Sequence, residues 1–290
     1  MEIPGLRGLG PFQLIKESIA DFLDDDMLTH ASALAFQALF SIFPFIIFLI
    51  ALLGFLQLTS FFEWLQSHAV MMLPAEAAKP VTEVIAGLQQ QQGGLLSFGV
   101  IFALWTASAA VRVVMNATNA AYDVREARPA WKLYPLSIIY TIGIAAMLIL
   151  SAVLMVLGPQ AMEWIGNQVG FGDTFVTVWT WLRWPAAFLL LILATAIIYY
   201  VCPNVEQEFR FITPGAMIAV VVWILASVGF NFYVANFADY NAMYGSIGAI
   251  IVLLFYLFIS SAVLLFGAEV NAVIEHHAPS GKDKGQKRAD

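Results

Sequence analysis

The chain has 290 residues, of which 61% are hydrophobic and only 11% carry a formal charge. Soluble domains average about 45–50% apolar and about 25% charged residues, so this composition predicts a membrane protein. The net charge of −7 gives no basis for binding nucleic acid, which needs a basic surface. The single cysteine, Cys202, excludes an intramolecular disulfide and a cysteine-based zinc site.

Residues 1–30 are predicted to form a cytoplasmic amphipathic segment. Apolar side chains recur there at helical spacing, with charged residues between them: Phe12, Ile15, Ile19, Phe22 and Leu23. This pattern is typical of a short helix lying on a membrane surface. The run Asp24–Asp26 that follows is interpreted as a solvated turn, with attraction of a cation or substrate as the alternative.

The apolar runs predict an all-α fold, a bundle of six transmembrane helices with short amphipathic surface helices. About 20 apolar residues cross the hydrocarbon core, and the clearest case, Tyr240–Ala268, has 29 residues without a charge. The first run starts only at Ala31 and is too long for a cleavable signal peptide, so it is interpreted as a retained anchor. Residues 31–275 therefore form the predicted membrane domain, and residues 276–290 a disordered cytoplasmic tail. The six spans are predicted at about 33–57, 95–111, 135–157, 184–202, 214–234 and 245–268.

Two features are predicted between the spans. Val81, Val84, Ile85 and Leu88 suggest a short amphipathic helix in the loop before the second span. Tryptophans cluster before the fourth span and indicate an aromatic belt at one membrane face: Trp164, Trp179, Trp181 and Trp184.

The first span carries polar residues on one face. Gln37, Ser41 and Pro44 are spaced i, i+4, i+7, so a helix brings them together. Pro44 removes a backbone donor and predicts a kink. The Ser41 hydroxyl or a neighbouring helix could satisfy the carbonyl freed near Phe40. Two interpretations stay open: a kink with interhelical hydrogen bonds, or a face that lines a substrate path.

The second span continues into a polar stripe. Its members follow one another at four, four, three and four residues: Ser108, Arg112, Asn116, Asn119 and Asp123. We expect one helix to carry them out of the membrane. The stripe is either a solvated face or a buried, hydrogen-bonded stripe that holds the bundle together at its cytoplasmic mouth.

The last two spans also contain polar and small residues. Asn231 lies near the end of the fifth span, and Gly245 and Gly248 allow another helix to approach the start of the sixth. Glu269 and Asn271 follow where the sixth span is predicted to leave the lipid. We hypothesise an ion pair between Arg112 and Glu269, with separate interfacial roles as the alternative.

Positive charges outside the spans predict the orientation. Eleven of the 13 Lys and Arg residues fall on the side that holds both termini, and only Lys79 and Arg183 fall on the other. Positive charges favour the cytoplasmic side, so both termini are predicted to be cytoplasmic. Two termini on the same side require an even number of spans, and six spans meet this requirement.

Five stretches, taken in order, resemble a known family. They are Ala33–Phe36 with Ser41–Pro44; Trp105–Ser108 with Asn119–Asp123 and Glu126–Pro129; Arg210 with Pro214–Ala216; Tyr244–Gly248; and Gly267–Asn271. This series, from about residue 12 to 275, is similar to the YihY/BrkB family of bacterial inner-membrane proteins, once labelled ribonuclease BN. The resemblance implies a six-helix bacterial inner-membrane protein with both ends in the cytoplasm. It also implies transport of lipids or other small molecules.

The residues themselves do not favour an enzyme. His30 and His68 fall on opposite sides of the predicted membrane, and His276 and His277 are adjacent, so no metal-ligand cluster of a nuclease is evident. No cofactor or metal is predicted, and the expected partners are membrane lipids and a lipid or small-molecule substrate. The sequence does not define the oligomeric state. Two classes remain: a transporter with a path between helices, or a membrane scaffold. Because no predicted span has a charged residue near its middle, facilitated passage is favoured over ion-coupled transport.

Overall fold

The computed structural model describes residues 10–55, 93–156, 172–207, 211–237 and 246–277. All the regular structure in these ranges is helical, which confirms the predicted all-α class. The chain divides into two compact units, one made of residues 1–36 and 108–290 and one of residues 37–107. Each unit is described by itself.

Seven helices make up the described part of the chain. They are α1 (Pro11–Asp24), α2 (Met27–Phe55), α5 (Gly93–Ala121), α6 (Ala130–Val156), α8 (Gly172–Val201), α9 (Pro214–Phe237) and α11 (Ser246–His276). All except α1 are long and apolar enough to cross a membrane. The predicted helix in residues 62–94, Trp164 and the tail beyond residue 277 lie outside the described residues.

Helices α6, α8 and α11 extend further than the sequence pattern indicated. Helices α6 and α8 begin before Pro135 and Pro185, and each contains its proline. A membrane helix tolerates proline when neighbouring groups satisfy the freed carbonyl, so these prolines do not mark helix starts. Trp179, Trp181 and Trp184 consequently lie on α8 itself. Helix α11 continues to His276, so Glu269 and Asn271 lie within the helix and not at its end.

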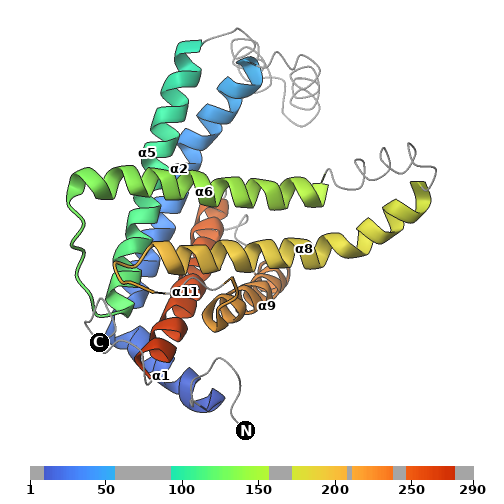
Figure 1. Ribbon diagram of the computed structural model, residues 1–290. Coiled ribbons are helices and arrows are strands. Elements are labelled where there is room, and N and C mark those ends of the chain that lie inside the picture. Colours follow the sequence, from blue (N-terminus) through green and yellow to red (C-terminus); the bar gives the residue numbers. More distant parts are fainter. Residues whose placement is uncertain (1–9, 56–92, 157–171, 208–210, 238–245, 278–290) are drawn as a thin grey trace. The chain divides into compact units, whose positions relative to one another are not determined.

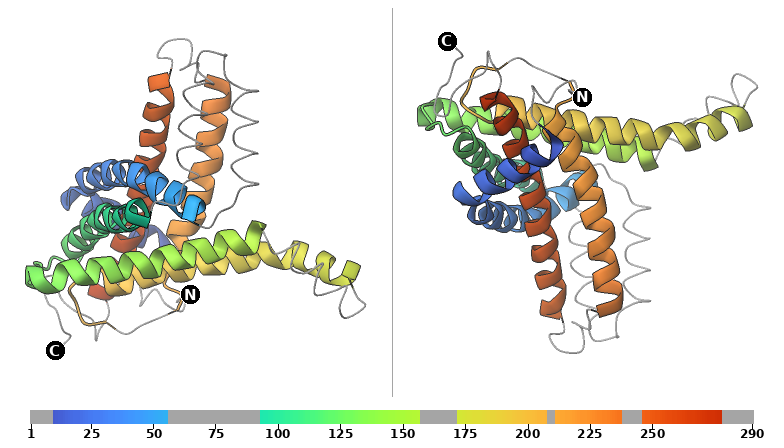
Figure 2. Two further views of the ribbon diagram at one scale, coloured as in Figure 1. Left: turned by 90° about the horizontal axis from the view of Figure 1, so that it is seen from above. Right: turned by 90° about the horizontal axis from the view of Figure 1, so that it is seen from below.

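In the larger unit, α6 and α8 form one antiparallel pair, and α9 and α11 form another. Helix α9 packs along α11 and α6 along α8, while α8 also contacts α9 and α1 contacts α11. Figures 1 and 2 show α6 and α8 running side by side, and likewise α9 and α11.

The buried core of the larger unit lies toward one end of its helices. Its apolar clusters come from the start of α2, the end of α5, the second half of α8, the start of α9 and the last turns of α11. Elsewhere, large apolar side chains are exposed, including Ile139 on α6, Leu225 on α9 and Phe255 on α11. Exposed apolar residues along spanning helices are expected where lipid is the solvent.

The smaller unit contains the second part of α2 and the first part of α5. The Gln37 side chain donates a hydrogen bond from Nε2 to the Thr106 carbonyl oxygen at 3.0 Å. The Ser41 hydroxyl donates to the Gln37 carbonyl at 2.7 Å, and not to the carbonyl of Phe40 as the sequence suggested. Pro44 is buried within α2. The Gln37 contact favours the interhelical hydrogen-bond interpretation of this polar face over a substrate path.

Candidate functional site

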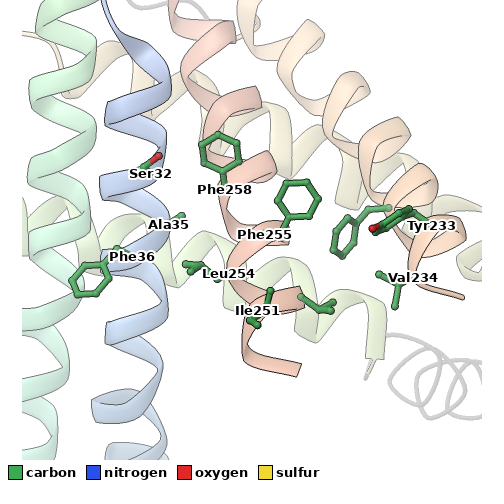
Figure 3. A pocket seen from close by; sticks show the side chains of 11 residues that line it. Ser32, Ala35, Phe36, Tyr233, Val234, Ile251, Leu254, Phe255 and Phe258 are labelled. Atoms are coloured by element: carbon green, nitrogen blue, oxygen red, sulfur yellow. The ribbon is translucent and has the colours of Figure 1, made fainter. Parts of the chain in front are cut away.

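A pocket of about 380 Å³ lies between α2, α9 and α11 in the larger unit. Figure 3 shows Ser32 and Ala35 on α2, Tyr233 and Val234 on α9, and Phe255 and Phe258 on α11 around it. The remaining lining residues are Phe36, Phe230, Ile251, Val252 and Leu254. Ligand pockets usually have about 300–1,000 Å³ and mostly apolar walls, so the size and chemistry fit an apolar ligand.

Aromatic side chains form much of one wall. The Phe230 ring centroid lies 5.8 Å from that of Phe255 and 5.4 Å from that of Tyr256. Ser32 donates its hydroxyl hydrogen to the Leu28 carbonyl within its own helix. The Tyr233 hydroxyl is the other side-chain polar group among the lining residues. The pocket therefore offers mainly apolar contact.

A polar network joins the end of α5 to the loops that follow α5 and α8. Asn119 is buried and donates from Nδ2 to Glu126 Oε2 at 2.9 Å, while its Oδ1 accepts from the Asn204 backbone N–H at 2.6 Å. Arg128 donates to both Glu126 oxygens at 2.8 Å and to the Cys202 carbonyl at 2.7 Å. This supports the hydrogen-bonded interpretation of the polar stripe, as far as Asn119 is concerned.

Two titrating groups in this network have shifted pKa values. Burial alone would raise the pKa of the Glu126 carboxyl, but hydrogen bonds and charge from Arg128, with a hydrogen bond from Asn119, lower it below its ordinary value. Burial raises the pKa of the Cys202 thiol to about 12. Glu126 is therefore held as a carboxylate at neutral pH, and Cys202 as an uncharged thiol.

The prediction that Asp123 continues the helical stripe is wrong. Helix α5 ends at Ala121, and Asp123 adopts a left-handed conformation with φ of 53°. The Val124 N–H donates to the Asn119 carbonyl at 2.9 Å, and the Asp123 N–H donates to the Ala120 carbonyl at 2.8 Å. This is the Schellman arrangement that ends a helix, with aspartate at the left-handed position. Asp123 and Asn116 are both exposed.

Arg112 connects α5 to α6. Its Nη1 donates to Ser108 Oγ at 2.8 Å and to Ser137 Oγ at 3.1 Å. The guanidinium carbon also lies 4.6 Å from the centroid of the Tyr134 ring, within range of a cation–π interaction. Arg112 and Ser108 thus belong to an interhelical contact, in line with the hydrogen-bonded alternative and not with a solvated face.

A close crossing of α9 and α11 places Asn271 at the start of α9. Thr213 caps α9 by accepting from the Ala216 N–H at 3.1 Å, and Pro214 occupies the first helical position. Asn271 Oδ1 accepts from the Gly215 N–H at 2.9 Å, and its Nδ2 donates to Thr213 Oγ1 at 3.1 Å. Asn271 therefore provides a second cap from the neighbouring helix.

Two glycines make this crossing sterically feasible. A Cβ on Gly215 would overlap the Gly267 carbonyl oxygen and lie 2.7 Å from Asn271. A Cβ on Gly267 would overlap the Tyr199 hydroxyl, which donates to the Leu264 carbonyl at 2.5 Å. Small residues commonly allow such close approach between membrane helices.

Glu269 is completely buried within α11. Leu265 and Ala272, four residues before and three after it, belong to the cluster with Met27 of α2 and Ala117 of α5. Since residues at these spacings share a helix face, Glu269 faces the same neighbours. Whether Glu269 pairs with Arg112 stays a prediction.

A double-mutant cycle tests that pair. If Arg112 and Glu269 form an ion pair, Arg112→Gln and Glu269→Gln should each destabilise the protein, and the double variant should lose less than the sum of the two. Unfolding of the parent, the two single variants and the double variant in detergent provides the coupling free energy. Additive losses would instead indicate separate roles.

The other candidate residues lie apart from these contacts. Asn231 is exposed on α9, and Gly248 is buried near the start of α11. Tyr244 and Gly245 lie outside the described residues. Among the described residues, no three His, Cys, Asp or Glu side chains are grouped so that they could hold a metal ion.

Sequence reasoning missed the pocket and several contacts between α9 and α11. Trp223 Nε1 donates to Ser260 Oγ at 3.1 Å, and the hydroxyls of Ser227 and Tyr256 lie 3.0 Å apart. The signal in the sequence was Trp, Tyr and Ser within two apolar helices. That signal does not say which helices face each other.

Six helices in the described part of the chain are long and apolar enough to cross a membrane, which defines a polytopic α-helical membrane protein. The chain belongs to the BrkB family: the family model described as virulence factor BrkB matches residues 18–290. This confirms the resemblance inferred from the sequence.

Named relatives extend the comparison. The chain is 35% identical over 261 residues to YfkH of Bacillus subtilis, whose name describes it as ribonuclease-like; the match covers 90% of this chain and 94% of YfkH. It is 28% identical to a UPF0761 membrane protein of Chromohalobacter salexigens and 25% identical to one of Ralstonia nicotianae. These matches cover 89% and 94% of this chain but only 62% and 60% of those relatives. No solved structure matches the chain.

Proposed function

We propose that this protein provides a path between its helices for a lipid or another small apolar molecule. The observation that supports the proposal is the pocket between α2, α9 and α11, whose lining residues lie in or beside the spanning segments. A ligand in this pocket would contact mostly hydrocarbon and aromatic side chains. Such a site suits a lipid chain better than a charged solute, because charge is costly to desolvate there.

The proposed passage is facilitated and involves no catalysis. The spans predicted from the sequence have no charged residue near their middle, where ion-coupled carriers usually place one. The observed second span is longer and includes Arg112, which is hydrogen-bonded to Ser108 and Ser137. RNA cleavage is not part of the proposal, although YfkH is named ribonuclease-like. Purified protein incubated with single-stranded RNA should cleave no more than a mock preparation.

Reconstitution into liposomes tests the proposed function. Purified protein in vesicles that contain a fluorescent phospholipid should expose more than half of the fluorophore to a membrane-impermeant quencher, because lipid crosses between leaflets. Protein-free vesicles should expose only the outer half. Efflux of a trapped small solute should be measured in parallel. Inactivity in both assays would favour a scaffold that carries nothing.

We also propose that both termini lie on the cytoplasmic side of a bacterial inner membrane. The support is the distribution of Lys and Arg, eleven against two. Reporter fusions after Lys79 and Arg183 should indicate the periplasm, and fusions after Arg128 and Lys282 the cytoplasm. A periplasmic C-terminus would contradict the six-span orientation.

A further inference from the structure

We propose that α1 docks on the membrane surface through a stripe of exposed apolar residues, with the lipid headgroup and upper acyl region as its partner. The stripe consists of Phe12, Ile15, Ile19 and Leu23, which are 82%, 49%, 49% and 59% exposed. Their spacing is i, i+3, i+7, i+11, which places them within about 80° of one another around a helix of 3.6 residues per turn. The stripe is therefore continuous along α1.

Two contacts fix the rotation of α1, one from Leu14 on the face opposite the stripe and one from Phe22 beside the stripe. Leu14 is buried against Val270, Val273 and Ile274 of α11. The rings of Phe22 and Phe266 meet edge to face at 5.9 Å. Since α1 is held through these residues, it cannot turn its apolar stripe into the core of the larger unit.

Polar contacts secure the same orientation. His277 Nε2 lies 3.2 Å from Glu17 Oε2, so the end of α11 also contacts the polar face of α1. Gln13 Nε2 donates to the other Glu17 oxygen at 2.9 Å. These contacts direct the polar face toward the chain's own polar groups and leave the stripe available.

The connection to the spans sets the level of α1. Helix α1 ends at Asp24, and only two residues separate it from α2, the first helix able to cross the membrane. Leu14 packs against the last turns of α11, the last such helix. Helix α1 is thus held beside the point where one span begins and another ends, which is the level of the membrane interface.

The charges along α1 suit a lipid surface. Lys16 lies beside the apolar stripe on the helix surface, while Glu17 and Asp24 lie more than about 90° around the helix from the centre of the stripe. The carboxylates therefore do not face the lipid phosphates. Because the contact is mainly apolar, docking should not require anionic lipid, in contrast to a polybasic anchor.

Spin labelling of the full-length protein tests the proposal. In a Cys202→Ala background, single cysteines replace Ile15, Ile19 or Gln13, and each carries a nitroxide. Gln13 is the matched control, because it is exposed on the polar face of the same helix. The proteins are reconstituted in phosphatidylcholine vesicles, and collisions with oxygen and with a water-soluble nickel complex are measured.

Labels at Ile15 and Ile19 should collide several-fold more with oxygen, relative to the nickel complex, than the label at Gln13. Equal ratios at all three positions would overturn the proposal, because the stripe would then face water. Protection of Ile15 and Ile19 from both reagents would also overturn it and would indicate cover by protein, such as a second copy. Melting temperatures equal to that of the Cys202→Ala parent show that the labelled chains are folded.

Discussion

Gly267→Ala is expected to destabilise the protein by about 2–3 kcal/mol, at the upper end of the cost of overpacking a well-packed core. The added Cβ would overlap the Tyr199 hydroxyl and lie 2.7 Å from both Ala219 Cβ and the Gly215 carbonyl oxygen. A backbone oxygen cannot move aside as a flexible side chain does. Helices α9 and α11 would have to separate, and the Asn271 cap on α9 would weaken with them.

Gly229→Ala on α9 is the matched control, because nothing lies within 4 Å of the Cβ it would introduce. In an exposed helix interior, alanine is more stabilising than glycine by about 0.5–1 kcal/mol, so this variant should be as stable as the parent or slightly more stable. Thermal unfolding in detergent, followed by tryptophan fluorescence, compares the two. Equal melting temperatures would contradict the close crossing.

Arg128→Ala is expected to cost about 2–3 kcal/mol, somewhat less than for a fully buried ion pair because the two side chains remain 15% and 18% exposed. The substitution removes three hydrogen bonds that Arg128 donates, two to Glu126 and one to the Cys202 carbonyl. It also leaves the mostly buried Glu126 carboxylate without its cation. Arg125→Ala is the control, since that side chain is exposed and a surface change usually stays within about 0.5 kcal/mol.

The pH dependence of this loss has a definite sign. The folded protein lowers the pKa of Glu126, so the ionised carboxylate stabilises the folded state. This contribution is fully present above the ordinary glutamate pKa of about 4.3 and disappears as the pH falls through the lower folded value. The stability difference between the parent and Arg128→Ala should therefore be largest near neutral pH and shrink below about pH 4. A difference that grew on acidification would contradict the assignment.

Hydropathy predicted the fold class because each span must bury about 20 apolar residues in lipid, and that requirement is visible in the sequence. Hydropathy predicted the ends of the helices less reliably. The third and fourth spans were predicted to begin at Pro135 and Trp184, although α6 begins at Ala130 and α8 at Gly172. Asp123 was placed on a helix that ends at Ala121, because the hydrogen bonds that reverse the chain there depend on backbone conformation and not on periodicity.

The candidate site could be predicted only in part. Asn119 and Asn271 were recognised as unusual polar residues near helix ends, but their partners, Asn204 and Gly215, are 85 and 56 residues away along the chain. Sequence spacing identifies residues on one helix face and does not identify the neighbouring helix. The pocket was missed for the same reason, since its lining comes from three helices of ordinary apolar sequence.

The core and the pocket occupy different parts of α11. Ile251, Leu254 and Phe255 line the pocket in the first half of the helix, whereas Leu265 and Val273 belong to the buried core in the second half. The glycine crossing and the Arg128 network lie with the core. This arrangement combines a closely packed end with an apolar recess further along the helices.

Measuring phospholipid exchange in liposomes that contain the Val234→Phe variant tests the proposed path most directly. Val234 lines the pocket, and a phenylalanine there would occupy part of the 380 Å³. Val221→Phe, on the exposed side of the same helix, adds the same bulk outside the pocket. In liposomes, the proposed path predicts a strong reduction of phospholipid exchange for Val234→Phe and parental exchange for Val221→Phe, at equal protein density. Parental exchange by both variants would contradict a path through this pocket.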